Sequence, residues 1–195
     1  MTGISSLQSV HKKGVFGDHH KKNENELVRI TELKNLSIIQ VVQYKNTKTE
    51  ISNLNIDGIK IPIQSSKVSC NKDTRILWVG PSIWLVISNK ENILEIINKE
   101  CGSENFAITD ISHSRAIIQI QGYQAKEILK KGCPINFNEF EKNNCAGSVF
   151  HGITILVDCV DSDLQIFNLL TLRSFGESFY HHLTDATLEF GYISV

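Results

Sequence analysis

The sequence lacks a surplus of charge of either sign, because 20 Lys and Arg residues face 21 Asp and Glu residues for a net charge of -1. This balance excludes a broad electrostatic attraction to nucleic acid or to an anionic membrane. Long apolar runs are also missing: none approaches the ~20 residues that a membrane-spanning helix needs. The N-terminal stretch MTGISSLQSVHKK has no continuous apolar core of the kind that marks a secretory signal. We therefore expect a cytoplasmic protein with neither a nucleic-acid nor a membrane partner.

Paired cysteines are missing as well. The five cysteines are widely spaced and none forms a C-x-x-C pair, which excludes zinc-ribbon and thioredoxin-like redox motifs. No G-x-G-x-x-G, Walker loop or H-x-x-x-H element occurs. We predict reduced, mostly buried thiols, with no metal site and no cofactor-binding site in this chain.

The first 26 residues are polar and show no periodic pattern. Such a segment buries too little apolar surface to order itself. We predict a flexible N-terminal arm over residues 1–26 that becomes ordered when a partner docks.

The body of the chain, residues 27–191, alternates short apolar strands with amphipathic helices. A hairpin followed by a helix occurs twice, at 75–101 and at 148–187. Such an order without long parallel crossovers predicts an α+β fold of antiparallel sheets built from repeated hairpin-helix units. We expect one compact unit, or alternatively two closely packed subdomains at about 27–107 and 108–191.

The stretch DISHSRAIIQIQG places several chemically versatile side chains within six residues. We predict one strand over residues 107–122, which puts Ser112 and Ser114 on one face and His113 and Arg115 on the other. A Ser-His-Asp triad needs an imidazole within reach of a hydroxyl and a carboxylate together, which neighbours on a strand cannot provide. These residues remain candidates for single contributions to a site.

Arginine is scarce, with only four residues in the chain: Arg29, Arg75, Arg115 and Arg173. Arg115 and Arg173 each lie beside a strongly apolar strand, where a guanidinium needs a carboxylate, a carbonyl or an anionic ligand. One interpretation is an intramolecular pair with Asp or Glu. The other is an anchor for a partner or a ligand carboxylate, to which His113 is a further candidate.

Cys133 is the one candidate nucleophile. A reactive thiol needs a base or a positive local field, and no histidine is near it in the sequence, although His151 is a candidate in space. His181-His182 is too closely set for an i, i+4 metal pair. We favour a structural cysteine and predict no catalytic residue, so the chain has the character of a partner rather than a catalyst.

Three segments carry a family resemblance: Asp110–Arg115, Gly122–Phe137 and Arg173–Ser178. With the earlier ILWVGPSIWLVIS, they make residues 28–191 similar to the gamma subunit of heterotetrameric sarcosine oxidase. That resemblance implies a fold like that of the folate-binding proteins related to the glycine-cleavage aminomethyltransferase. It also implies a complex with alpha, beta and delta subunits that oxidatively demethylates sarcosine to glycine, produces hydrogen peroxide and passes the one-carbon unit to tetrahydrofolate.

In that family FAD, FMN and NAD reside on partner subunits, so the resemblance assigns no cofactor to this chain. An isolated gamma-like chain can self-associate through the surface meant for a partner. The alternative is a free-standing YgfZ-like folate or one-carbon binder, whose motif is K-G-C-[YF]-x-G-Q-E. Here Lys131-Gly132-Cys133 is followed by Pro134–Phe137 without Gly-Gln-Glu. A third interpretation is an enzyme that uses Cys133 with a distant histidine.

Overall fold

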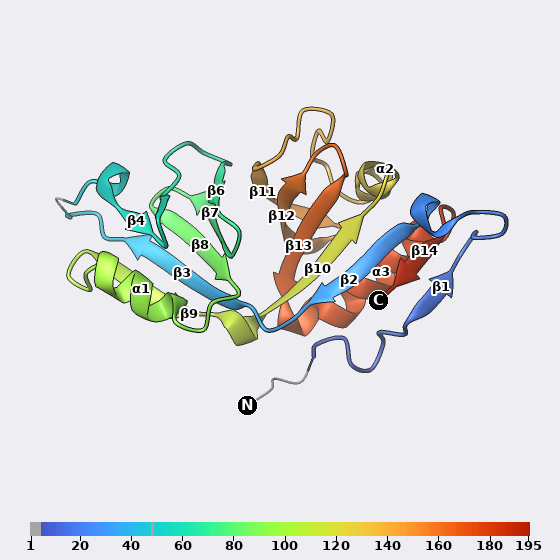
Figure 1. Ribbon diagram of the computed structural model, residues 1–195, viewed down its shortest axis with the longest axis horizontal. Coiled ribbons are helices and arrows are strands. Elements are labelled where there is room, and N and C mark those ends of the chain that lie inside the picture. Colours follow the sequence, from blue (N-terminus) through green and yellow to red (C-terminus); the bar gives the residue numbers. More distant parts are fainter. Residues whose placement is uncertain (1–4, 48) are drawn as a thin grey trace. The chain divides into compact units, whose positions relative to one another are not determined.

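The computed structural model describes residues 5–47 and 49–195 and divides the chain into two compact units (Figure 1). Unit 1 joins the chain up to Lys34 with His113–Val195, and unit 2 is Asn35–Ser112. Unit 2 is thus inserted between two strands that pair with each other in unit 1.

Unit 1 contains a seven-stranded sheet in the order β1-β14-β2-β10-β13-β12-β11. All neighbours are antiparallel except β14 and β2, which are parallel. The strands are β1 (Gly14–Phe16), β2 (Val28–Leu33), β10 (Arg115–Gln121), β11 (Cys145–Phe150), β12 (Ile153–Asp161), β13 (Ile166–Leu172) and β14 (Tyr192–Ser194). The helices are α2 (Ala125–Lys130) and α3 (Gly176–Thr187), with the 3-10 turns η1 (Glu24–Glu26), η3 (Ser112–Ser114, at the junction of the two units) and η4 (Arg173–Phe175).

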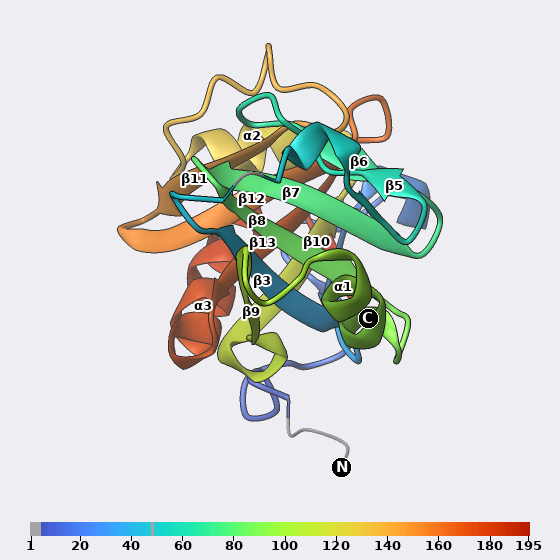
Figure 2. The same ribbon diagram turned by 90° about the vertical axis from the view of Figure 1, so that its left-hand side faces the viewer.

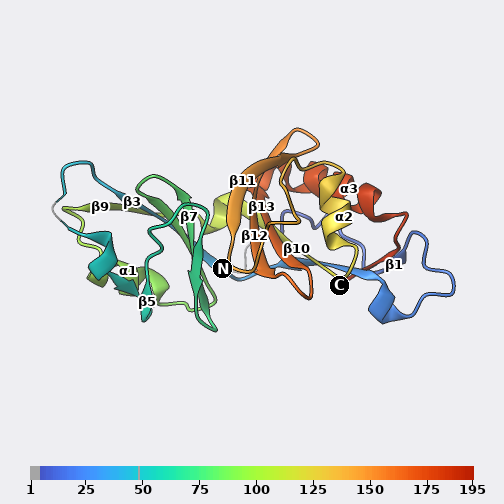
Figure 3. The same cartoon turned by 90° about the horizontal axis from the view of Figure 1, so that it is seen from above.

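The core of unit 1 lies between one face of this sheet and the two helices (Figure 3). Alternate β-branched and aromatic side chains of the central strands point to this face, as the period of two requires. They pack against the apolar stripes of α2 and α3; among the buried members are Ile118, Ile120, Ile128, Leu129, Val157, Phe167, Leu169, Phe179 and Leu183. Each such side chain contributes about 1.5–3 kcal/mol on burial.

Unit 2 contains a five-stranded antiparallel sheet in the order β6-β7-β8-β3-β9 and a small hairpin, β4-β5. Helix α1 lies beside the sheet (Figure 2) and buries Ile93 and Ile97 in the same core cluster as the sheet residues. The elements are β3 (Ser37–Gln43), η2 (Ile51–Asn53), β4 (Asn55–Ile56), β5 (Ile59–Lys60), β6 (Val68–Cys70), β7 (Thr74–Gly80), β8 (Ile83–Ser88), α1 (Ile93–Glu100) and β9 (Phe106–Asp110).

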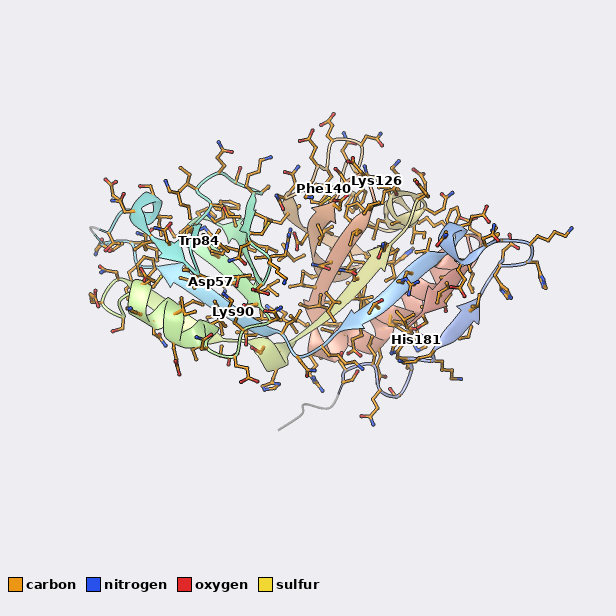
Figure 4. All side chains as sticks on the ribbon, viewed as in Figure 1. Asp57, Trp84, Lys90, Lys126, Phe140 and His181 are labelled. Carbon is orange, nitrogen blue, oxygen red and sulfur yellow. The ribbon has the colours of Figure 1, made fainter. Side chains whose placement is uncertain are left out.

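Polar side chains fasten the β4-β5 turn to the sheet of unit 2 (Figure 4). The Asp57 carboxylate accepts hydrogen bonds from Lys90 Nζ at 2.5 Å and from Thr74 Oγ1 at 2.8 Å. The amide of Asn71 donates a third at 3.1 Å. Burial is the largest single influence and favours the neutral carboxyl, but these hydrogen bonds together hold the pKa of Asp57 below its usual value.

The predicted single strand over residues 107–122 is wrong. The chain forms β9 in unit 2 and β10 in unit 1, separated by η3. The Asp110 carboxylate accepts hydrogen bonds from the backbone N–H of Ser112 at 2.9 Å and from its hydroxyl at 2.5 Å. The Ser112 hydroxyl also accepts a hydrogen bond from the backbone N–H of Ile38 at 2.8 Å. Short polar side chains that bond the nearby backbone favour a turn over a continuing strand, so the motif marks the crossing between units.

Two other element boundaries differ from expectation. The apolar pattern of residues 147–160 predicts one strand, but the structure has the hairpin β11-β12 there, because His151 and Gly152 adopt φ of +47° and +83° in a two-residue turn. The sequence pattern of residues 173–186 predicts one helix, but this segment begins with the tighter turn η4, where Phe175 is exposed, whereas Phe179 and Leu183 of α3 are buried.

Parts of the N-terminal segment pack on unit 1; Met1–Ile4 of the expected arm lie outside the described residues. Strand β1 pairs with β14, and Leu7 is fully buried in the core. The His11 ring packs edge-on against Tyr180 at 5.6 Å. Leu7 and the partly buried Val10 and Phe16 pack in this core, although they show no period in the sequence. The flexibility of the arm and its ordering by a partner stay predictions.

The boundary between the units also differs from the subdomains considered above. Strand β2, which a division near residue 107 assigns to the first half, pairs with β10 and β14 in unit 1. Pairing across an inserted unit leaves no local signal, since the two strands are about as far apart in sequence as unit 2 is long.

Candidate functional site

Arg115 and Arg173 come together at one end of two paired strands. In the antiparallel register of β10 and β13, Arg115 lies directly opposite Leu172, and Arg173 is the next residue of the chain. Both arginines are half-buried, whereas Leu172 and Phe175 are 42% and 48% exposed. We call Arg115, Leu172, Arg173 and Phe175 the arginine surface.

A glycine allows this arrangement. Gly176 is buried at the start of α3, where an added Cβ would lie 3.0 Å from Ser6 Oγ and 3.5 Å from the Cβ of Ala116 on β10. The helix can therefore begin close to the strand, which holds η4 at the end of β13. The glycine of the R-S-F-G segment thus lets the start of α3 lie close to β10, which positions Arg173 and Phe175 in the preceding turn.

The electrostatic surroundings of the two arginines differ. Arg173 has an interaction within the chain. Across the part of the chain that the structure describes, no hydrogen bond or ion pair is found for the Arg115 side chain. The intramolecular carboxylate pair considered from the sequence is therefore not formed by Arg115 with any described residue. His113 is exposed in η3, two residues before Arg115, at the same end of β10.

Cys133 lies in a second candidate region. Its side chain is 4% exposed, and Sγ lies 3.3 Å from the hydroxyl of Ser148 on β11. His151 does come close to this loop: its N–H donates to Gly132 O at 3.1 Å, and a Cβ on Gly132 would lie 2.7 Å from its ring. The thiol is directed to a hydroxyl, which is neither a base nor a positive charge, so this geometry favours a structural cysteine.

A polar ladder crosses the middle of the unit 1 sheet, and sequence analysis missed it. Gln119 Nε2 donates to Asn168 Oδ1 at 2.9 Å, and Asn168 Nδ2 donates to Asp158 Oδ2 at 3.2 Å. The residues lie opposite one another on β10, β13 and β12, and Asp158 is fully buried. The one available signal was a carboxylate within the apolar run ITILVDCV. The ladder satisfies its own polar groups and fixes the register of three strands.

Among residues 5–47 and 49–195, no group of three or more His, Cys, Asp or Glu side chains is arranged to hold a metal ion. The five cysteines all lie in the described part of the chain, and none of them forms a disulfide. Within the same residues, no helix has the length and apolar character to cross a bilayer.

A family model and individual relatives both match the chain to sarcosine oxidase gamma subunits. Residues 51–189 match the model of the sarcosine oxidase gamma subunit family. The chain is 28% identical over 137 residues to the sarcosine oxidase subunit gamma of Corynebacterium sp. strain U-96, and 28% identical over 138 residues to that of Arthrobacter sp.. These alignments cover 68% of this chain and 66% of each relative, so the chain spans just under two thirds of their length.

Comparison with solved structures confirms the predicted fold. A chain of heterotetrameric sarcosine oxidase from Corynebacterium sp. U-96, solved with pyrrole 2-carboxylate, matches with a TM-score of 0.78 and 23% identity over 86% of this chain and 87% of that one. The glycine cleavage system aminomethyltransferase T of Bartonella henselae matches with a TM-score of 0.61 and 12% identity, over 82% of this chain and 46% of that one. The α+β, antiparallel, aminomethyltransferase-like fold is therefore correct.

The part of the chain that matches the family model includes the three structural features described for this chain. It spans the crossing turn at Asp110–Ser112, the Cys133 loop and the arginine surface. Together with the curated relatives and the fold, it confirms the resemblance found in the sequence: the chain belongs to the sarcosine oxidase gamma subunit family.

Proposed function

We propose that this chain is the gamma subunit of a heterotetrameric sarcosine oxidase and docks on its partner subunits without supplying a catalytic residue. The complex would demethylate sarcosine oxidatively to glycine, release hydrogen peroxide and pass the one-carbon unit to tetrahydrofolate. The alpha, beta and delta subunits are the partners, and FAD, FMN and NAD belong to them. Family membership is what supports this assignment.

The observation that carries the docking role is the arginine surface. Arg115 is half-buried without a carboxylate partner among the described residues, and two large apolar side chains beside it, Leu172 and Phe175, are exposed. Partly buried arginines and aromatic residues supply much of the binding energy at protein interfaces. A guanidinium that already lies in a partly desolvated site also loses less on pairing with a carboxylate than a fully hydrated one. The proposed partner surface is therefore apolar with at least one acidic side chain facing Arg115, and Arg173 and His113 are additional anchors.

The chemistry of the remaining candidates supports a role without catalysis. The Cys133 thiol is buried against Ser148, and the Asp158 carboxylate is held in the polar ladder. The free state of all five thiols supports a reducing compartment, and we propose that the complex is cytoplasmic.

A co-purification experiment tests this function. The tagged chain is co-expressed with the alpha, beta and delta subunits, and the captured material is assayed for flavin absorbance and sarcosine-dependent peroxide. We expect a yellow, active complex that contains this chain in stoichiometric amount. A fully active complex that forms without this chain, or capture of the chain alone, would contradict the proposal.

A free-standing folate or one-carbon binder is the second candidate, and the likeness to an aminomethyltransferase fold favours it. Titration of the isolated chain with tetrahydrofolate separates the two. Saturable binding by the isolated chain, with no partner captured, would support the second candidate.

A further inference from the structure

Strand β11 forms one edge of the unit 1 sheet. It is the last strand in the order, and β12 pairs with it on one side over all six residues without a bulge. Of the strands that end the two larger sheets in the described chain, β11 is the longest, since β1 and β6 have three residues and β9 has five. It therefore offers the longest row of main-chain groups at any of these edges.

The register identifies the backbone groups that point away from β12. The two-residue turn at His151 and Gly152 makes Phe150 the first hydrogen-bonded position, and such positions recur at every second residue of an antiparallel pair. The Cys159 N–H donates to Asn144 O at 2.9 Å, six residues before Phe150, which agrees with this phase. The N–H and C=O groups of Gly147 and Val149 thus point outward.

These outward groups are open to solvent. Gly147 is exposed, and no atom lies within 4 Å of the place where its Cβ would be. Val149 is 38% exposed. No described residue forms a hydrogen bond with the outward N–H or C=O of either residue.

The edge also lacks the features that usually prevent pairing. Its sequence, CAGSVF, contains no charged residue and no proline, and its pairing with β12 is regular. Sheet edges in soluble proteins are normally blocked by lysine, proline, bulges or very short strands. An unblocked edge of this length presents a template for an added strand.

We propose that the edge of β11 receives an extended, uncharged segment of a partner subunit, which adds an eighth strand to the sheet. Main-chain hydrogen bonds to Gly147 and Val149 would hold the segment, as in other cases of strand addition. The open space over Gly147 fits a large apolar or aromatic side chain of the added strand, which covers a glycine on its neighbour. This inference rests on the proposed function, because the heterotetramer supplies the partner. The surface is separate from the arginine surface, which lies at the ends of β10 and β13 rather than along an edge.

Residue-resolved hydrogen exchange tests the pairing directly. In the isolated chain at low concentration, the amides of Ala146 and Ser148, bonded to β12, exchange slowly, and those of Gly147 and Val149 exchange fast. In the purified complex we expect exchange at Gly147 and Val149 to slow by at least tenfold. If the chain enters the complex and these two amides keep their fast exchange, the inference is wrong while the proposed function stands. Failure to enter any complex contradicts the proposed function instead.

A matched pair of variants provides a second test. Gly147→Pro removes one outward N–H and places a ring at the edge, whereas Gly147→Ala keeps the N–H and adds only a methyl into open space. We expect Gly147→Pro to weaken assembly at least tenfold relative to Gly147→Ala. Equal assembly of two folded variants contradicts the inference. Exchange that slows with concentration in the isolated chain would show pairing with a second copy and would overturn the choice of a partner segment.

Discussion

Two charged groups beside apolar strands, Asp57 in unit 2 and Arg115 in unit 1, meet opposite environments. Asp57 is surrounded by donors from its own unit, and its pKa falls below the usual value despite burial. Arg115 is half-buried beside exposed apolar side chains and has no carboxylate partner among the described residues. A charge whose partners are built into its own unit stabilises the fold, whereas a charge without them is available for recognition. A charged side chain beside an apolar strand therefore has a structural role in unit 2 and a proposed docking role in unit 1.

The largest expected effect is on the stability of unit 2. Asp57→Ala leaves the Lys90 ammonium without its acceptor and the buried Thr74 hydroxyl with the Ser88 hydroxyl as its remaining partner. We expect this change to lower the free energy of unfolding by about 3 kcal/mol. Both tryptophans of the chain, Trp78 and Trp84, lie in this unit, so denaturant unfolding followed by tryptophan fluorescence reports it. Asp57→Asn keeps an acceptor and serves as the control, with roughly half the loss. A loss of unfolding free energy below about 0.5 kcal/mol for Asp57→Ala would contradict the structural role of Asp57 in unit 2.

A substitution can give Arg115 a carboxylate partner within its own unit, as Asp57 has donors within unit 2. Leu172→Glu places a carboxylate directly across the strand pair, where we expect it to stabilise the isolated chain by about 0.3–1 kcal/mol. The same pair would occupy the guanidinium and weaken assembly with the partner subunits. Leu172→Ala controls for the loss of the apolar side chain. Stronger assembly of Leu172→Glu than of Leu172→Ala would contradict a carboxylate-binding role for Arg115.

Thiol reactivity tests whether the Cys133 loop holds a nucleophile. Cys70 is exposed, whereas Cys133 is buried against Ser148. Burial also raises the pKa of Cys101 to about 11, so its reactive thiolate is scarce at neutral pH. With a maleimide at pH 7, we expect Cys70 to be modified at least tenfold faster than Cys133, measured by mass spectrometry of peptides. Faster labelling of Cys133 would revive an enzymatic role for this loop.

The smallest expected effect is a pH dependence of the N-terminal segment. His11 Nε2 is buried without a hydrogen-bond partner among the described residues, and burial is the main reason that the pKa of His11 is lowered. The unfolded chain therefore binds a proton at His11 more readily than the folded chain does. Above the usual pKa of 6.5 both states are neutral and the folded chain keeps its full stability, and the free energy of unfolding decreases as the pH falls below that value. Thermal unfolding of His11→Gln between pH 7.5 and 5 should vary less than that of the wild type. His20→Gln, at an exposed position, should behave like the wild type.

The sequence alone supported the features that local chemistry determines. The chain turns at Asp57-Gly58 and at Gly80-Pro81-Ser82, where Asp57 and Ser82 have positive φ. Glycine, proline and short polar residues favour such turns, so both can be predicted from the local sequence. Three motifs made the sequence resemble the family, and that resemblance implied the fold.

Features set by distant contacts were not predictable in this way. The crossing at Asp110–Ser112 depends on a hydrogen bond to Ile38, and the pairing of β2 with β10 spans a whole unit. The pairing of Arg115 opposite Leu172 depends on the register of strands separated by two other strands and a helix. Sequence analysis identified the arginines of the candidate site but not their neighbourhood.

We propose that this chain is a docking subunit whose anchor is Arg115. The most direct test measures the affinity of the purified chain for the alpha-beta-delta assembly by titration calorimetry, with Arg115→Ala and Arg29→Ala compared. Arg29 is exposed and lies opposite Gln121, at the other end of β10. Arg29→Ala is the control, because it removes the same charge. We predict a loss of about 30-fold for Arg115→Ala, the size of an interface hot spot of about 2 kcal/mol, and little change for Arg29→Ala. Equal affinities for both variants and the wild type would contradict the claim.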